Sequence, residues 1–307
     1  MTVPIGVLVM AYGTASGPED IERYYTDIRG GRAPSPELLT DLRERFVAIG
    51  NRFPLLDTTR EQAAGIEREL NALDSGTYAT YLGMKHSPPS IAEAVARMRE
   101  DGVERAVGIV MAPHGSRLST DTSIERAEKA LADGGPSFSF VRHWYDHPLF
   151  VEFLATRVSD ALAALSPAEA EKAVVVFSAH SLPARILEWN DPYPTQLQET
   201  ADLVAAKLGL TDVVTAWQSA GRTPEPWLGP PIEETIVSLA AQGYLAIVVC
   251  AAGFVADHLE TLFDLDIEAQ KIAAGAGVRL VRTEMPNADP VFVRTVAHVI
   301  RDHLEAA

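Results

Sequence analysis

The sequence predicts an α/β fold of two similar halves, each with a four-stranded parallel sheet flanked by helices. Three observations predict it. Short apolar, β-branched segments alternate with amphipathic segments of helical length along the whole chain, a pattern typical of parallel sheets. The order of these segments repeats from the first half to the second. The chain has 307 residues, which is long for one domain and comfortable for two.

Eight strands are expected, because eight apolar segments have the length and β-branched composition of buried strands. In the first half they are residues 4–11, 77–83, 105–111 and 137–143. In the second half they are residues 172–178, 212–217, 244–251 and 277–283.

The two halves match each other in sequence. Residues 7–12 resemble residues 175–180, where each half begins its first strand. A Pro-x-Phe-Val motif stands at 148–151 and again at 290–293, each time opening a long helix after the fourth strand. Two facing α/β halves leave a cleft at the carboxyl ends of their strands, where open sheets bind ligands.

We therefore expect an N-terminal domain over 1–145, a C-terminal domain over 146–288, and a final helix, 289–305, that packs back on the first domain. The first half carries an insertion at about 24–58 between its first two strands. From residue 23 to residue 60 there are seven arginines against five acids. Long insertions at the mouth of a cleft are often lids, and the alternative is a solvated helix of mixed charge.

Composition excludes several classes of function. With 47% hydrophobic and 22% charged residues, the chain is typical of a soluble globular protein. The net charge of −16 argues against binding to nucleic acid or to an anionic membrane surface. A single cysteine, Cys250, excludes an internal disulfide, a four-thiolate zinc site and a conventional iron–sulfur cluster. The N-terminus does not resemble a signal peptide, and the longest apolar run is about half a membrane span, so we expect a cytoplasmic protein.

The first candidate for chemistry is His180, which ends the apolar strand at the start of the second half. A polar residue at the carboxyl end of a parallel strand is placed to face the cleft. The alternative is a structural histidine with satisfied hydrogen bonds.

Three carboxylates form the second candidate site. Glu260, Asp264 and Glu268 are spaced i, i+4, i+8, so a helix aligns them in one column. Like charges at this spacing repel, and the apolar neighbours of these residues indicate a largely buried helix. An acidic column of this kind is suited to conduct a divalent cation; the alternative is an acidic stripe that faces solvent.

His180 and Glu260 follow strands of the same half and are expected to meet in one cleft. An imidazole with carboxylates and no thiolate suits a borderline ion such as Fe²⁺ that is handed on rather than held. His114 follows the third strand of the first half and is a candidate for the same space, and His86 follows the second strand. Tyr12 ends the first strand, where it either packs in the core or offers a phenolate ligand to a metal.

At this point the motifs resemble those of the ferrochelatases, most closely the bacterial coproporphyrin ferrochelatases, over nearly the whole chain. The motifs that carry the resemblance are residues 9–14 (VMAYGT), 20–25 (DIERYY), 178–183 (SAHSLP), 191–194 (DPYP), 217–219 (WQS), 226–230 (PWLGP), 253–260 (GFVADHLE) and 284–287 (EMPN).

The resemblance implies a monomer of two Rossmann-like domains of the class II chelatase type, with no tightly bound cofactor and Fe²⁺ as a substrate. It implies that His180 and Glu260 bind the metal, and that His180 also takes pyrrole protons. Tyr12 matches a tyrosine that ligates the iron of the product. Asp264 and Glu268 match an acidic row that can hold a second hydrated divalent ion such as Mg²⁺, on a helix with a π-type stretch.

The resemblance also implies how the porphyrin is bound. Arg29 and Arg45 match arginines near the propionates, Phe46 lies where tyrosine is common, and Ser219 matches a serine on the opposite wall. Phe53 and Ile124 depart from a serine and a tyrosine in related enzymes, so polar contacts to the porphyrin rim are expected to be fewer or rearranged. The cysteines that bind an iron–sulfur cluster in some relatives are missing, so no cluster is expected.

The expected activity is insertion of Fe²⁺ into coproporphyrin III. Coproporphyrin carries four propionates and protoporphyrin two, and the arginine-rich insertion favours the former. The alternatives are a protoporphyrin IX ferrochelatase, a chelatase for another tetrapyrrole, and a porphyrin or haem carrier without catalysis. A transient contact with the next enzyme of haem synthesis is expected.

Overall fold

The eight expected strands form two separate parallel sheets in the computed structural model, which describes residues 3–73, 77–132 and 134–306. The first sheet has the order β2-β1-β3-β4 and the second β6-β5-β7-β8, so the two halves share one topology. The strands are β1 (Ile5–Ala11), β2 (Tyr78–Met84), β3 (Arg105–Val110), β4 (Ser137–Val141), β5 (Ala173–His180), β6 (Val213–Gln218), β7 (Ala246–Cys250) and β8 (Arg279–Arg282). The predicted fold class is confirmed, and each strand overlaps its predicted range.

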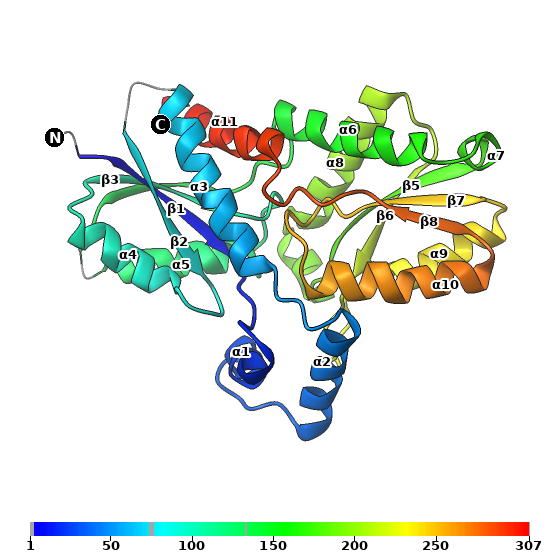
Figure 1. Ribbon diagram of the computed structural model, residues 1–307, viewed down its shortest axis with the longest axis horizontal. Coiled ribbons are helices and arrows are strands. Elements are labelled where there is room, and N and C mark those ends of the chain that lie inside the picture. Colours follow the sequence, from blue (N-terminus) through cyan, green and yellow to red (C-terminus); the bar gives the residue numbers. More distant parts are fainter. Residues whose placement is uncertain (1–2, 74–76, 133, 307) are drawn as a thin grey trace.

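Helices connect the strands and cover the sheets (Figure 1). In the first half they are η1 (Pro18–Asp20), α1 (Ile21–Ile28), α2 (Pro36–Ala48), α3 (Leu55–Leu73), α4 (Ile91–Glu100) and α5 (Thr120–Leu131). The rest of the chain forms α6 (Pro148–Ala163), α7 (Pro167–Glu171), η2 (Ala184–Trp189), α8 (Tyr193–Leu208), α9 (Ile232–Ala241), η3 (Glu260–Ala269), α10 (Gln270–Ala276) and α11 (Pro290–Ala306).

Local sequence explains where several helices begin and end. The hydroxyl of Ser90 accepts a hydrogen bond from the backbone N–H of Glu93, and the carboxylate of Glu93 accepts one from the backbone N–H of Ser90. Helix α4 therefore begins with a capping box. Ser166 and Glu169 do the same at α7. Helix α8 ends at Gly209 with φ +68°, a left-handed conformation that glycine adopts at little cost.

One apolar core crosses the boundary between the halves. It contains Val7 of β1 and Val175 of β5, together with Trp144, Phe150 and Phe292. In Figure 1, α11 returns to lie along α3 and beside α6, and contacts in the structure join α11 to both helices. The predicted division of the chain at residues 145 and 146 stays a prediction, since the halves share this core.

The insertion is a folded element. Helices α1 and α2 lie below the two sheets in Figure 1. Ile21, Leu39 and Phe46 of this region form an apolar cluster with Leu262 of η3. The insertion therefore packs on the helix that carries the acidic column.

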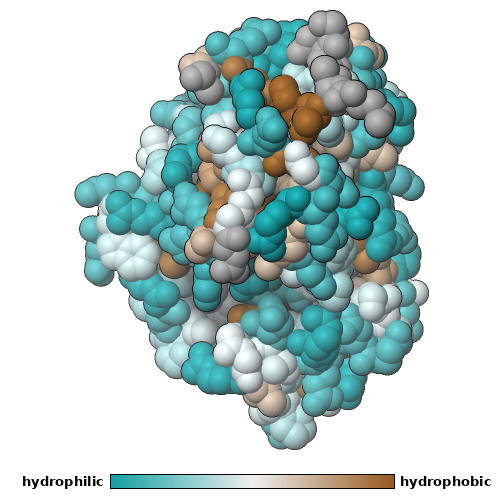
Figure 2. Space-filling view, turned by 90° about the vertical axis from the view of Figure 1, so that its left-hand side faces the viewer, coloured by the Kyte–Doolittle hydropathy of each residue, from teal (hydrophilic) through white to brown (hydrophobic). Residues whose placement is uncertain are grey.

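The outer face of the first half, shown in Figure 2, is mainly hydrophilic with small hydrophobic areas. This agrees with the net charge of −16. Among the described residues, no helix is both long and apolar enough to cross a membrane.

Candidate active site

The structure brings His180 and Glu260 together. His180 is the last residue of β5, and Glu260 is the first residue of η3, which follows β7. Nε2 of His180 lies 3.4 Å from Oε1 of Glu260, and Nε2 of His258 lies 3.4 Å from the other carboxylate oxygen. Tyr193 donates a hydrogen bond of 3.0 Å to the backbone carbonyl of His180, which fixes the end of the strand. One carboxylate is thus held between two imidazoles.

Electrostatics favour the charged forms of this pair. Burial disfavours the imidazolium of His180, but the Glu260 carboxylate and the Ser181 carbonyl outweigh it and raise the pKa of His180 to about 9. Burial opposes ionisation of Glu260 in the same way, and the imidazoles of His180 and His258 nevertheless lower the pKa of Glu260 below its usual range. At neutral pH the pair is therefore an imidazolium beside a carboxylate.

The helix behind Glu260 has the expected wide turn. The whole of η3 is a π-helix, in which hydrogen bonds run from i to i+5. Because this turn is wider than that of an α-helix, residues four apart stay closer to one line. Burial and the charge of Glu260 raise the pKa of Asp264 to about 7, so Asp264 can change its protonation near neutral pH.

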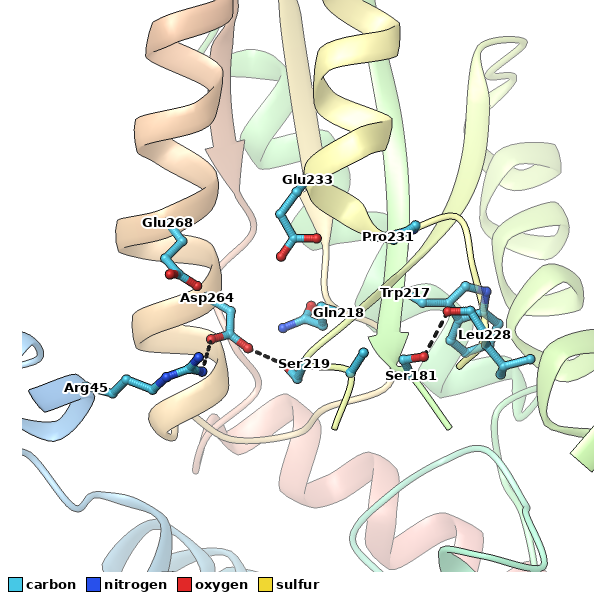
Figure 3. A pocket seen from close by; sticks show the side chains of 11 residues that line it. Arg45, Ser181, Trp217, Gln218, Ser219, Leu228, Pro231, Glu233, Asp264 and Glu268 are labelled. Carbon is cyan, nitrogen blue, oxygen red and sulfur yellow. Dashed lines mark hydrogen bonds and ion pairs between the residues drawn. The ribbon is translucent and has the colours of Figure 1, made fainter. Parts of the chain in front are cut away.

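A cavity of about 170 Å³ lies beside the acidic column (Figure 3). Asp264 and Glu268 enter it from η3, and Glu233 faces them from α9. Ser219 donates a hydrogen bond to one oxygen of Asp264, and Nη1 of Arg45 lies 3.5 Å from the other. Arg45 thus provides positive charge at one end of a cavity that three carboxylates line together with neutral polar side chains such as Gln218 and Ser181.

A second cavity, of about 900 Å³, lies between the two halves and has residues of both in its walls. His180, Glu260 and Asp264 line it from the second half, and Tyr12, whose side chain is half exposed, lines it from the end of β1. Its volume is in the upper range for small-molecule sites. The predicted cleft between the strand ends is therefore present.

The expected porphyrin-binding residues divide into two groups. Arg45, Phe46 and Ser219 line the large cavity, and Arg45 is bound to Asp41 at 3.2 Å as well as to Asp264. Arg29 is not among the described residues that line it; its guanidinium carbon lies 5.8 Å from the ring centre of Tyr25. Glu268, which was predicted to hold the second divalent ion with Asp264, lines the smaller cavity.

Two of the positions that depart from the family pattern, Ile124 and Phe53, do not line the large cavity, whereas Phe46 does. Ile124 is 1% exposed and packs in the core with Leu8 and Met10. Phe53 stacks on Phe46 with ring centres 4.5 Å apart. Neither side chain is among the described residues that line the cavity. These two departures therefore change the packing behind the lining residues and not the lining itself.

Sequence reasoning missed several lining residues. Lys85 at the end of β2, and Arg126 and Lys129 on α5, add positive charge to the cavity wall. Burial and the nearby Arg126 lower the pKa of Lys85 to about 8. Glu233 was missed because acidic residues are common in the first turn of a helix and so do not indicate a site. Only the folded chain brings Glu233 opposite Glu268. Lysine and arginine on an amphipathic helix likewise carry no signal of a site.

Two histidines of the first half line the large cavity, and for His114 this was expected. Nδ1 of His86 lies 2.6 Å from Oδ2 of Asp27. His114 is 1% exposed, and its Nε2 lies 2.9 Å from the hydroxyl of Thr200. Burial lowers the pKa of His114 to about 3, so it is neutral in the folded protein.

The protein thus has two parallel β-sheets with the same strand order and a cavity between its two halves. A histidine–carboxylate pair lies in the wall of this cavity. This arrangement is the chelatase fold. Solved structures agree. SirB from Bacillus subtilis with Fe³⁺ matches with a TM-score of 0.62 and 12% identity, covering 98% of this chain and 95% of that chain. The sirohydrochlorin chelatase SirB in complex with cobalt, from Bacillus subtilis subspecies spizizenii, matches with a TM-score of 0.61 and 11% identity, covering 98% and 96%.

Sequence comparison is more specific. The family model described as Ferrochelatase matches residues 4–304. The coproporphyrin III ferrochelatase of Anoxybacillus flavithermus is 49% identical over 303 residues, covering 98% of this chain and 96% of that protein. That of Bacillus subtilis is 46% identical over 299 residues, covering 96% of each chain. The chain belongs to the ferrochelatase family, whose members are metal chelatases.

Proposed function

We propose that this protein inserts Fe²⁺ into coproporphyrin III to give Fe-coproporphyrin III, a step of haem biosynthesis. The observation that carries the proposal is the pairing of His180 with Glu260 at the wall of a cavity of about 900 Å³. Curated relatives at 44–49% identity over nearly the full chain bear the name coproporphyrin III ferrochelatase.

In this proposal Glu260 binds the divalent ion and His180 accepts the pyrrole protons. Inserting a metal requires removal of two pyrrole protons, for which an imidazole is a suitable acceptor. The Glu260 carboxylate raises the pKa of His180 to about 9, so beside this carboxylate His180 holds a proton at neutral pH. A divalent ion that binds Glu260 competes with this proton, since both are attracted to the same carboxylate. His180 then releases its proton to water in the cavity, accepts one pyrrole proton, passes this proton to water and accepts the second in the same way.

The cavity wall suits a substrate with several carboxylates. Four basic side chains line it: Arg45, Lys85, Arg126 and Lys129. Charge-assisted hydrogen bonds from such groups hold carboxylates well. We assign the propionates of the porphyrin to these four residues, and we assign to Tyr12 the role of axial ligand to the iron of the product.

We further propose that the small cavity holds a second, hydrated divalent ion such as Mg²⁺. No group of three His, Cys, Asp or Glu side chains in the described part of the chain is arranged to hold an ion directly. Asp264 and Glu268 therefore act through water, and 170 Å³ leaves room for several water molecules. The proposal also includes a monomeric, cytoplasmic enzyme without an iron–sulfur cluster, whose product passes to the next enzyme of haem synthesis.

The test compares Fe²⁺ insertion into coproporphyrin III and protoporphyrin IX under anaerobic conditions. The purified protein should turn over coproporphyrin III with the higher kcat/KM, and His180→Ala should lose insertion by about 10²–10⁴-fold, the usual contribution of a proton-transfer group. A preference for protoporphyrin IX would overturn the substrate assignment. Tight porphyrin binding with no insertion would identify a carrier instead.

A further inference from the structure

A single buried amide joins the first half of the molecule to the loops that lead to the metal site. Gln62 lies on α3 and is fully buried. Its Nε2 donates hydrogen bonds of 2.9 Å to the carbonyl of Val255 and 2.8 Å to the carbonyl of Asn287. Both acceptors belong to the second half, one in the loop after β7 and the other in the loop after β8.

The chemistry of this contact fixes the orientation of the amide. Two carbonyl oxygens can only accept, so the group that faces them has to be the NH₂ of Gln62. Its Oε1 has no hydrogen-bond partner among the described residues. Burying an amide with an unpaired oxygen is unfavourable, and an apolar side chain of the same length avoids it. The contribution of Gln62 therefore lies in its two donated hydrogen bonds.

The loop that Gln62 holds leads directly to Glu260, one of the two proposed metal ligands. Val255 precedes Glu260 by five residues, and His258 lies between them. The side chain of Asn287 accepts a 2.8 Å hydrogen bond from the backbone N–H of Asp257 and donates another of 2.8 Å to its carboxylate. Gln62 thus supports the loop twice, directly at residue 255 and through Asn287 at residue 257.

The other side of the same loop is tied to η3. The guanidinium of Arg282 donates to Asp257 at 3.1 Å and to both oxygens of Asp266, at 2.7 and 2.8 Å. Asp257 precedes Glu260 and Asp266 follows it, so the carboxylate of Glu260 lies on a segment anchored at both ends. The contacts of Arg282 lie within the second half, and the hydrogen bonds of Gln62 connect the same loop to the first half.

Helix α3 also contacts the space for the porphyrin. Leu55, Thr59 and Gln62 line the large cavity from successive turns of this helix, which follows the insertion that carries Arg45 and Phe46. Helix α3 therefore both lines the proposed porphyrin cavity and holds the loop before Glu260.

We infer that Gln62 is a positioning residue for Glu260 and His258: its two hydrogen bonds fix the loop from which the metal-binding carboxylate extends. This inference rests on the proposed function of the site. Groups that orient metal ligands typically change metal affinity or activity by about 10–100-fold when they are removed.

The test uses Gln62→Leu in the full-length protein, with Asn71→Leu as a matched control. Asn71 lies on the same helix, and its amide likewise donates to two carbonyls, those of Glu67 and Tyr78, away from the cavity wall. We expect Gln62→Leu to lower kcat/KM for Fe²⁺ by about 10–100-fold while KM for the porphyrin stays unchanged. The control should retain both parameters, although both variants lower the unfolding temperature.

A second readout is independent of turnover. Co²⁺ added without porphyrin has an absorption spectrum that depends on its ligands, and Gln62→Leu should alter this spectrum while Asn71→Leu leaves it as in the wild type. If Gln62→Leu does not fold, Asn287→Gly tests the part of this support that passes through Asn287, because it keeps both hydrogen bonds of Gln62 and removes the side-chain contacts to Asp257. The backbone of Asn287 has φ +44°, which glycine adopts readily, while the contacts to Asp257 are lost. It should show the same loss for Fe²⁺.

The inference is overturned if Gln62→Leu, or Asn287→Gly in its place, matches the control in Fe²⁺ kinetics and in the Co²⁺ spectrum. It is also overturned if the loss appears in KM for the porphyrin instead of in the parameters for the metal. If the wild-type protein inserts no iron, the proposed function fails, and the Co²⁺ spectra alone decide whether Gln62 shapes the metal site.

Discussion

Acid should destabilise this protein through His114, and the size of the effect follows from its burial. The side chain is 1% exposed, and Nδ1 has no hydrogen-bond partner among the described residues. Burial lowers the pKa of His114 to about 3 in the folded state, against about 6.5 in an unfolded chain. Between these values the unfolded chain binds a proton at this histidine that the native protein does not bind.

The sign and magnitude follow from proton linkage. Because the folded pKa lies below the unfolded one, the contribution to stability is complete above about pH 6.5 and falls as the pH falls toward 3. At pH 5 the difference of about 1.5 pH units corresponds to a loss of about 2 kcal/mol in the free energy of unfolding, at 1.36 kcal/mol per unit.

Urea unfolding between pH 8 and pH 5 tests this for the wild type, His114→Gln and His143→Gln. Glutamine keeps a polar group near Thr200 without a titrating nitrogen, so the pH-dependent loss should shrink by about 2 kcal/mol relative to the wild type. His143 is exposed, and its substitution should leave the pH dependence unchanged. If the wild type and His114→Gln lose stability in parallel, the reasoning about burial is wrong.

Two further predictions concern the walls of the site. A Cβ at Gly253 would lie 2.5 Å from Cβ of Ala179, next to His180, so Gly253→Ala should lower stability by about 1–3 kcal/mol in urea unfolding. Gly275→Ala, where a Cβ meets nothing within 4 Å, is the control and should show no such loss. Ser219→Ala removes a hydrogen bond that lowers the pKa of Asp264, so this pKa should rise above its value of about 7. The acidic limb of the pH–rate profile should then move to higher pH, and an unmoved limb would show that Asp264 does not control it.

The fold could be predicted because its signals are local. Eight buried strands, such as β5 with its run of valines, are recognisable as apolar segments, and their repeated order predicts two matching sheets. His180 and Glu260 could be paired for the same reason, because the carboxyl ends of neighbouring parallel strands lie at one edge. The domain boundary remains a prediction, because apolar side chains such as Phe150 and Phe292 carry no sign of which half they pack against.

The rest of the site depends on tertiary placement. Lys85 and Arg126 belong to elements with their own helical or strand pattern, and only folding places their charges on the cavity wall. The role of Arg29 stays a prediction: its guanidinium lies beside Tyr25, and Tyr25 lines the large cavity. Gln62 has no motif at all, because its partners are backbone carbonyls 193 and 225 residues away in the chain.

The apolar core shared by the two halves has a consequence for how a flat, rigid ligand enters. Proteins that close around a ligand by rotating two domains need an interface that can separate at low cost. Here such a rotation would bring Trp144, Phe150 and Phe292 into water. Separating α1 and α2 from the second half would expose much less apolar surface, because their contact with Leu262 belongs to a much smaller apolar cluster.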